Sequence, residues 1–317
     1  MQNNLIVSSS PHIASHDATP KIMWSVFFAL LLSGAAGVFI FGMRALMVIL
    51  VSIASCVATE YLIQKLRRKK ITISDGSAAL TGLLLAYNLS STVPLWMPLV
   101  GGFFAIAICK QAFGGLGRNI FNPALAARAF LLASWPKHMT DFARPFTLDA
   151  ISSATPLACF KLGKVSGMDE LGLSYWDMFL GKRGGCLGEV CIVALLIAAV
   201  YLLWKKYIWW QTPLGFILTV GGLSWVFGQQ GFLKGDFLFS ILSGGLILGA
   251  FFMATDYVTS PLTKQGQLVF GVGCGLITFV IRRFGGYPEG VSYSILIMNA
   301  VVPLIDRYVR PRVYGVK

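Results

Sequence analysis

The sequence predicts an all-α polytopic membrane protein with about ten transmembrane helices, arranged as two inverted five-helix repeats with short or broken helices. Two observations of composition point to this class. Hydrophobic residues make up 56% of the 317 residues and charged residues only 12%, whereas a soluble domain carries about 25% charged residues. The third observation is that apolar runs follow one another with short gaps, each near the length of about 20 residues that one span needs.

The apolar runs define ten predicted spans. In chain order they are Met23–Gly42, Ala45–Gln64, Ser77–Leu89, Leu95–Ala112, Asn122–Trp135, Leu187–Trp204, Leu214–Gly228, Phe237–Ala254, Leu268–Ile281 and Val291–Ile305. The third and fifth runs are short, which predicts broken or half-spanning helices there.

Positive charge is concentrated at the ends of the apolar runs. The net charge is +13, but no nucleic-acid module signature accompanies it, so nucleic acid is not expected as a partner. Arg67–Lys70, Lys205–Lys206 and the tail Arg310–Lys317 agree with one alternating topology under the positive-inside rule, and Arg282–Arg283 is a mild violation. We therefore expect a multi-pass protein of the cell (inner, cytoplasmic) membrane with both termini in the cytoplasm.

The two halves of the chain share short motifs. Phe113-Gly114-Gly115 recurs as Phe284-Gly285-Gly286, and Leu80-Thr81-Gly82 recurs as Leu242-Ser243-Gly244. Five spans per half is an odd number, so the halves must be inverted relative to each other. The predicted division is an N-terminal repeat with its cytoplasmic tail (1–135), an external loop (136–186) and a C-terminal repeat (187–317). Chance similarity between glycine-rich membrane helices is the alternative.

Cysteine and histidine are not arranged as metal ligands. None of the six cysteines forms a Cys-x-x-Cys pair, and the three histidines are far apart in sequence. We therefore expect neither a metal site nor a catalytic side chain in this chain.

The external loop carries the most informative motif, Asp149-Ala150-Ile151-Ser152-Ser153-Ala154-Thr155-Pro156. Its small residues would let a bulky group approach the hydroxyl of Thr155, and Pro156 favours an extended backbone at Thr155. A Ser/Thr capping turn is the structural alternative.

This stretch resembles the flavinylation signature Asp-x-x-Ser/Thr-Gly-Ala-Thr, at whose last threonine a flavin transferase attaches FMN through a phosphoester. The match covers Asp149, Ser152, Ala154 and Thr155. Ser153 departs from it, because the signature has glycine there. Serine is also small, so the turn should survive unless the position requires a positive φ.

Nearly the whole chain resembles the D subunit of the Rnf electron-transport complex, which is homologous to the B subunit of the sodium-translocating NADH:quinone reductase. The shared motifs are Ser9-Ser-Pro-His-Ile13, Phe113-Gly-Gly-Leu-Gly-Arg-Asn-Ile-Phe-Asn-Pro123, Gly185-Cys-Leu-Gly-Glu189, Phe252-Met-Ala-Thr-Asp-Tyr-Val-Thr-Ser-Pro261 and Tyr287-Pro-Glu-Gly290.

The resemblance implies a membrane flavoprotein subunit of an ion-translocating ferredoxin:NAD⁺ oxidoreductase, with no stand-alone catalysis. It implies covalent FMN at Thr155 on the outer side and a non-covalent riboflavin, for which Asn122, Thr255 and Asp256 are candidate contacts. It also implies coupling to Na⁺ or H⁺ transport. The implied partners are membrane lipid, an FMN-bearing subunit on the outer face, and cytoplasmic subunits that react with NAD and ferredoxin.

A small-solute channel or transporter with a urea- or ammonium-channel-like fold is the alternative function. An inverted repeat with broken helices fits that class equally well. The segment Asp149–Thr155 distinguishes the two, because a channel has no need of it. A structural membrane scaffold is a third option, and it gives no reason for the motif.

Overall fold

The computed structural model describes residues 18–146, 155–162, 172–228, 231–287 and 289–310, and it is mostly helical. Three of the described helices are long and apolar enough to cross a membrane, namely Thr19–Phe41, Met43–Leu66 and Lys264–Phe284. Large apolar side chains cover much of the surface; Phe39 is 81% exposed and Trp204 is 76% exposed. An apolar surface of this kind is stable in contact with lipid but not with water, which agrees with the membrane protein that the composition predicts.

The first part of the chain forms seven consecutive helical elements. They are α1 (Thr19–Phe41), α2 (Met43–Leu66), η1 (Ile73–Asp75), α3 (Ser77–Tyr87), α4 (Trp96–Phe103), the π-helix η2 (Phe104–Gln111) and α5 (Pro123–Ser134). The half-length of α3 and α5 agrees with the short third and fifth spans expected from the sequence.

Three short helices and the second set of long helices follow. They are α6 (Pro136–Met139), α7 (Pro156–Lys161), α8 (Tyr175–Leu180), α9 (Ile192–Trp204), α10 (Gln211–Val226), the hairpin strands β1 (Phe227–Gly228) and β2 (Gly231–Phe232), α11 (Phe237–Leu242), α12 (Leu246–Leu248), the π-helix η4 (Gly249–Met253), α13 (Lys264–Phe284) and α14 (Val291–Tyr308).

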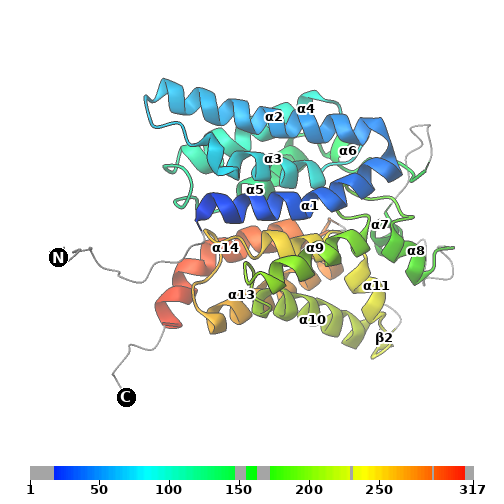
Figure 1. Ribbon diagram of the computed structural model, residues 1–317. Coiled ribbons are helices and arrows are strands. Elements are labelled where there is room, and N and C mark those ends of the chain that lie inside the picture. Colours follow the sequence, from blue (N-terminus) through cyan, green and yellow to red (C-terminus); the bar gives the residue numbers. More distant parts are fainter. Residues whose placement is uncertain (1–17, 147–154, 163–171, 229–230, 288, 311–317) are drawn as a thin grey trace, which may run out of the picture.

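The long helices run side by side in two layers (Figure 1). One layer contains α1 to α5, in which α2 packs against α3 and α4; the other contains α9 to α14, in which α10 packs against α13. The layers meet where α1 contacts α9 and α5 contacts α14. Helix α1 begins and α14 ends at one end of the bundle, whereas α7 and α8 lie at the opposite end (Figure 1).

The eighth predicted span, Phe237–Ala254, is not one helix but two pieces, α11 and the continuous segment of α12 and η4. The chain breaks after α11 at Gly244, whose φ of 66° lies in the left-handed region. A break inside a membrane frees backbone carbonyls that need donors. Two arginines supply them, of which Arg183 is buried and Arg282 half-buried: Arg183 donates to the carbonyls of Leu242 and Gly244, and Arg282 donates to that of Ser243. The sequence interpretation missed this break because it counted Ser243, Gly244 and Gly245 as part of one apolar run.

The sixth span begins later than predicted, at Ile192 instead of Leu187. The amides of Leu187 and Gly188 donate to the carbonyls of Leu89 and Tyr87, at 2.9 and 3.1 Å. These carbonyls lie at the end of α3, where a helix leaves its last carbonyls without intrahelical partners. The segment therefore closes the end of α3 instead of extending α9.

Gly82 provides a test of helix packing. A Cβ at Gly82 would lie 2.7 Å from the Cα of Ile53 and 2.8 Å from the carbonyl oxygen of Ser52, both backbone atoms of α2. We expect Gly82→Ala to lower the free energy of unfolding by about 1–3 kcal/mol, because a backbone cannot move aside as a side chain can. Thermal unfolding of the detergent-solubilised protein measures this.

Gly222, within α10, is the matched control. Among the described residues, no atom lies within 4 Å of a Cβ built there. Gly222→Ala should be neutral or slightly stabilising, since alanine has the higher helix propensity. Equal destabilisation by both substitutions would contradict the packing explanation.

Candidate functional site

Thr155 caps the short helix α7. Its φ of −65° and ψ of 150° are extended, as the following proline favours, and its Oγ1 accepts the amide hydrogen of Ala158 at 3.2 Å. The capping turn named as the structural alternative is therefore present. The rest of the motif, Asp149, Ser152, Ser153 and Ala154, lies outside the described residues.

Thr155 is 4% exposed, and it lines a cavity between α5, α7 and the start of α14. We call this the Thr155 cavity. Its lining residues are Arg128, Ala129, Leu132, Met139, Thr140, Phe142, Thr155, Ala158, Tyr287, Glu289, Ser292 and Tyr293. The rings of Tyr287 and Tyr293 stack with centroids 5.5 Å apart at 25°. Lys161 ties α7 to this wall, because its Nζ donates to the carbonyl of Tyr287 at 2.6 Å.

Arg128 supplies the positive charge of the Thr155 cavity. Its Nη2 lies 2.5 Å from Oε2 of Glu289, and its Nη1 donates at 2.9 Å to both Oδ1 of Asn88 and Oγ of Ser292. The guanidinium side chain is 10% exposed. One arginine thus joins α3, α5 and α14 by charge-assisted hydrogen bonds, which fix its orientation.

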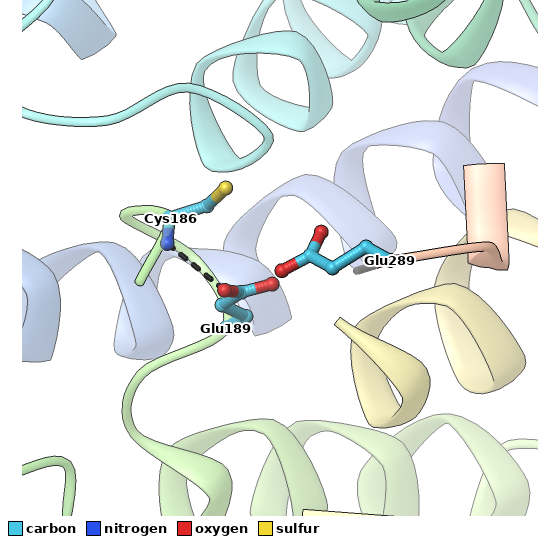
Figure 2. Close-up of side chains that lie close together, drawn as sticks. All are labelled: Cys186, Glu189 and Glu289. Atoms are coloured by element: carbon cyan, nitrogen blue, oxygen red, sulfur yellow. Dashed lines mark hydrogen bonds between the residues drawn. The ribbon is translucent and has the colours of Figure 1, made fainter. Parts of the chain in front are cut away.

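Behind Arg128, three possible ligand groups converge: Cys186, Glu189 and Glu289, whose Sγ and carboxylate oxygens lie within 4.8 Å of one another (Figure 2). Glu189 Oε1 accepts the amide of Cys186 at 3.0 Å. A metal ion here would compete with Arg128, which already contacts Glu289 and lies 3.8 Å from Cys186 Sγ. The cluster is therefore best described as a hydrogen-bonded network around the ion pair of Arg128 and Glu289.

Sequence reasoning did not assemble this network. The motifs Gly185–Glu189 and Tyr287–Gly290 were the available signals, but neither reveals that the two segments meet.

A second cavity lies at the other end of α5, and we call it the Asn122 cavity. Its lining residues are Ile22, Met23, Val26, Ser77, Leu80, Thr81, Leu84, Lys110, Leu116, Asn119, Asn122, Pro123, Ala124, Leu202, Ile208, Phe251, Phe252, Thr255, Asp256, Tyr257 and Val258. All three residues named as candidate contacts of a second cofactor, Asn122, Thr255 and Asp256, line it. The structure therefore brings them together, although they come from two distant parts of the chain.

Asn122 begins α5, as its position before Pro123 predicts. Its Oδ1 accepts the amide hydrogens of Ala124 and Leu125 at 3.1 and 3.4 Å. Asn122 therefore caps these amides itself, so they do not point free into the cavity. Its Nδ2 donates to the carbonyl of Met253 at 3.3 Å.

Helix α5 separates the two cavities. Its first residues, Pro123 and Ala124, line the Asn122 cavity, whereas Arg128, Ala129 and Leu132 line the Thr155 cavity. The Asn122 cavity also contains residues from the beginning of α1, and the Thr155 cavity contains α7. Because α1 begins and α7 lies at opposite ends of the bundle (Figure 1), the cavities face opposite ends of the protein.

Comparisons with known proteins agree over the whole chain. A sequence model of the NQR2, RnfD, RnfE family matches residues 6–315. The chain is 50% identical to the D subunit of the Na⁺-translocating ferredoxin:NAD⁺ oxidoreductase complex of Acetobacterium woodii, over 99% of this chain and 96% of that protein. It is 49% identical to the D subunit of the proton-translocating ferredoxin:NAD⁺ oxidoreductase complex of Clostridium ljungdahlii, over 100% and 98%. It is 37% identical to the D subunit of an ion-translocating oxidoreductase complex of Escherichia coli, over 98% of each.

Proposed function

Because the chain belongs to the NQR2, RnfD, RnfE family, we propose that it is the D subunit of an ion-translocating ferredoxin:NAD⁺ oxidoreductase complex and carries electrons across the membrane through two flavins. The observation that carries this proposal is the pair of cavities on either side of α5, one of which contains Thr155. The channel alternative has no comparable support. The relatives named above are subunits of oxidoreductase complexes, and the chain matches each of them over at least 96% of its length.

The first flavin is FMN, esterified to Oγ1 of Thr155. The residues of the Thr155 cavity fit such a group: the guanidinium of Arg128 complements the negative charge of a phosphoester, and the stacked rings of Tyr287 and Tyr293 offer an aromatic wall. When bound, FMN supplies electron transfer that amino-acid side chains do not. The role of the chain is to hold it, orient it and exclude water.

The second flavin is a non-covalent riboflavin in the Asn122 cavity. Thr255 and Asp256 supply polar groups at its rim, while Phe251 and Phe252 supply apolar surface. A mostly apolar cavity with a few converging polar groups is typical of cofactor sites.

The membrane arrangement in this proposal is the one that the sequence predicts. It has ten spans in two inverted repeats, the termini in the cytoplasm, and the Thr155 cavity on the outer side beside an FMN-bearing subunit. Subunits that react with NAD and ferredoxin bind the cytoplasmic face. Moving one elementary charge through 100 mV is worth about 2.3 kcal/mol, so electron transfer across the protein favours a compensating cation movement.

Everted membrane vesicles test this function. Vesicles with the intact complex receive reduced ferredoxin and NAD⁺, and NADH formation is followed together with uptake of radioactive Na⁺ and quenching of a pH-sensitive dye. We expect NADH formation with uptake of one of the two ions, and loss of both activities in vesicles that lack this subunit. Steady electron transfer without any ion gradient would refute the coupling.

Thr255 allows a separate test of the second flavin. Its Oγ1 donates to the carbonyl of Phe251 at 2.6 Å, which leaves its lone pairs free to accept. We expect Thr255→Val to weaken the retention of non-covalent flavin by about tenfold, the value of one hydrogen bond. Flavin extracted with acid from the purified complex and quantified by fluorescence measures this.

Thr219→Val is the matched control, because Thr219 makes the same bond to the carbonyl four residues earlier, that of Gly215 at 2.7 Å, on α10. The control should retain its flavin. Equal loss from both variants would indicate a general effect on helices and contradict a contact at Thr255.

A further inference from the structure

A buried ion pair lies against the Asn122 cavity. Lys110 Nζ of η2 lies 2.9 Å from Oε2 of Glu60 on α2, and each side chain is 2% exposed. Lys110 and Ser77 both line the cavity. A charge at such depth is costly unless it is paired, and it marks a functional site by default in a membrane protein. The function argued so far gives this pair no role.

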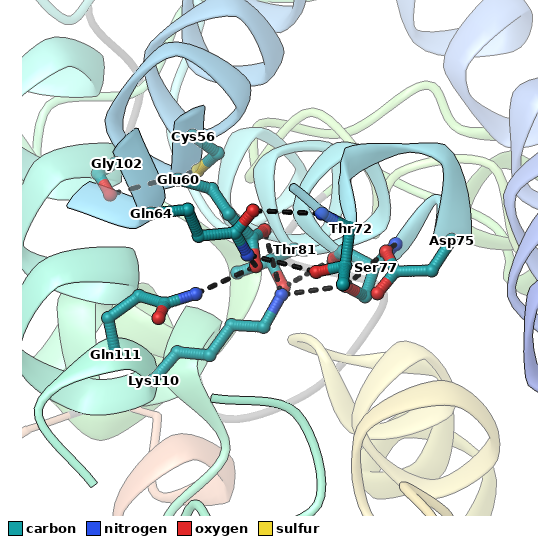
Figure 3. Close-up of polar contacts among 10 residues, drawn as sticks. All are labelled: Cys56, Glu60, Gln64, Thr72, Asp75, Ser77, Thr81, Gly102, Lys110 and Gln111. Atoms are coloured by element: carbon teal, nitrogen blue, oxygen red, sulfur yellow. Dashed lines mark hydrogen bonds and ion pairs between the residues drawn. The ribbon is translucent and has the colours of Figure 1, made fainter. Parts of the chain in front are cut away.

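Glu60 is held as a fixed acceptor. Besides Lys110, it accepts hydrogen bonds at Oε1 from Nε2 of Gln64 at 3.2 Å and from Nε2 of Gln111 at 2.9 Å (Figure 3). Three donors around one carboxylate leave it little freedom to turn, so Glu60 anchors the ammonium of Lys110 at the cavity wall.

Lys110 is also the inner end of a chain of hydrogen bonds. Its Nζ donates to Oγ of Ser77 at 2.6 Å, and Oγ of Ser77 donates to Oδ1 of Asp75 at 2.7 Å (Figure 3). Asp75 is half-buried and precedes α3, whereas Lys110 and Ser77 are buried. Lys110 and Ser77 therefore connect the cavity wall to a carboxylate, that of Asp75, which reaches the surface.

The ammonium of Lys110 has three N–H donors, and two of them have acceptors among the described residues, Glu60 and Ser77. The third is available to the cavity that Lys110 lines. Besides Lys110, the ionisable residues on the cavity wall are Asp256 and Tyr257. Arg67, at the end of α2, lies beside the network and donates to the carbonyl of Gln111 at 2.7 Å.

We propose that Lys110 is the proton donor to the group bound in the Asn122 cavity, and that Ser77 and Asp75 return the proton to it from the surface. This inference rests on the proposed second flavin. With a flavin bound there, an electron from the covalent FMN of the same chain would reduce it by one electron, and a proton taken up with that electron would keep its charge unchanged. The donated proton leaves Nζ of Lys110, so the N–H bond breaks there and a bond to the flavin forms.

The return path conserves every proton. The proton that Lys110 gives up is replaced as it leaves, so Glu60 keeps its cation. Asp75 takes a proton from water and passes it to Oγ of Ser77, while the hydroxyl hydrogen of Ser77 moves to Nζ of Lys110. Each group ends in its starting state, and the net transfer is one proton from water to the flavin.

The test uses the purified complex with Ser77→Ala, which breaks the chain and leaves both charges, and Lys110→Arg, which keeps the charge but does not release its proton. Stopped-flow absorbance follows reduction of the non-covalent flavin in H₂O and D₂O. The phase that belongs to this flavin is identified by its smaller amplitude in the Thr255→Val complex, which retains less of the flavin. Ser25→Ala is the matched control, because among the described residues its Oγ bonds within α1, to the carbonyl of Lys21 at 2.7 Å.

We expect Ser77→Ala and Lys110→Arg to retain the non-covalent flavin and to slow its reduction at least about tenfold, with further slowing in D₂O, while Ser25→Ala keeps the wild-type rate. Wild-type rates in both relay variants would overturn the inference. So would loss of the flavin from Ser77→Ala, which would assign Ser77 to binding. If the wild-type complex contains no non-covalent flavin, both the relay and the proposed second flavin are wrong. The proposed FMN at Thr155 is tested separately, by the fluorescence of covalent flavin.

Discussion

Replacing Thr155 by valine is expected to abolish covalent flavin in this protein. Valine has the shape of threonine but lacks the Oγ1 to which a phosphoester would be attached. The substitution also removes the cap of α7, the bond from the amide of Ala158 at 3.2 Å, which costs about 1 kcal/mol. That cost is small enough for the protein to fold. The protein is co-expressed with a flavin transferase, separated on a denaturing gel and examined for flavin fluorescence in the gel.

Thr263→Val separates loss of the flavin from loss of a cap. Thr263 caps α13 in the same way, with its Oγ1 accepting the amide of Gly266 at 3.0 Å. The fluorescent band should persist in this control and vanish only in Thr155→Val. A band of equal intensity in Thr155→Val would remove Thr155 as the attachment site. No band in the wild type, with an active transferase present, would remove the covalent flavin altogether.

Removing the charge of Lys110 is expected to be the most destabilising single change in the membrane core. Lys110→Met leaves the carboxylate of Glu60 charged, 1% exposed and without its cation. Breaking a buried ion pair from one side costs about 3–5 kcal/mol. We therefore expect a marked fall in the unfolding temperature of the detergent-solubilised protein and a lower yield of assembled complex.

The double variant Glu60→Gln with Lys110→Met shows whether charge is the cause. Glutamine retains an acceptor oxygen for the amides of Gln64 and Gln111, and no uncompensated charge remains. Its stability should return to within about 1 kcal/mol of the wild type. If the double variant were as unstable as Lys110→Met, packing and not charge would explain the loss.

Much of the fold was predictable because it depends on local sequence. The membrane class follows from composition, and most predicted spans coincide with helical structure because a continuous apolar run satisfies its backbone within itself. The start of α5 at Pro123 follows from an asparagine before a proline, and the extended backbone of Thr155 follows from Pro156. These are effects of immediate neighbours, so no knowledge of the rest of the chain is needed.

The break in the eighth span, by contrast, was decided by distant residues. The run Phe237–Ala254 is mostly apolar, and its small residues Ser243 to Gly245 only permit a break. The helix divides at Gly244 because Arg183 and Arg282 satisfy the carbonyls that the break exposes. A sequence pattern can indicate that a helix break needs hydrogen-bond donors, but it does not show which residues supply them.

The sequence by itself determined the class of protein, the position of the apolar helices and the choice of Thr155 as a candidate attachment site. Only the tertiary structure brought Asn122, Thr255 and Asp256 to one cavity, paired Arg128 with Glu289, and paired Glu60 with Lys110. Residues of these groups are separated by 50 to more than 130 positions. Hydropathy and turn preferences act over a few residues, whereas a buried charge is stable only beside its partner, and that partner is selected by how the helices pack.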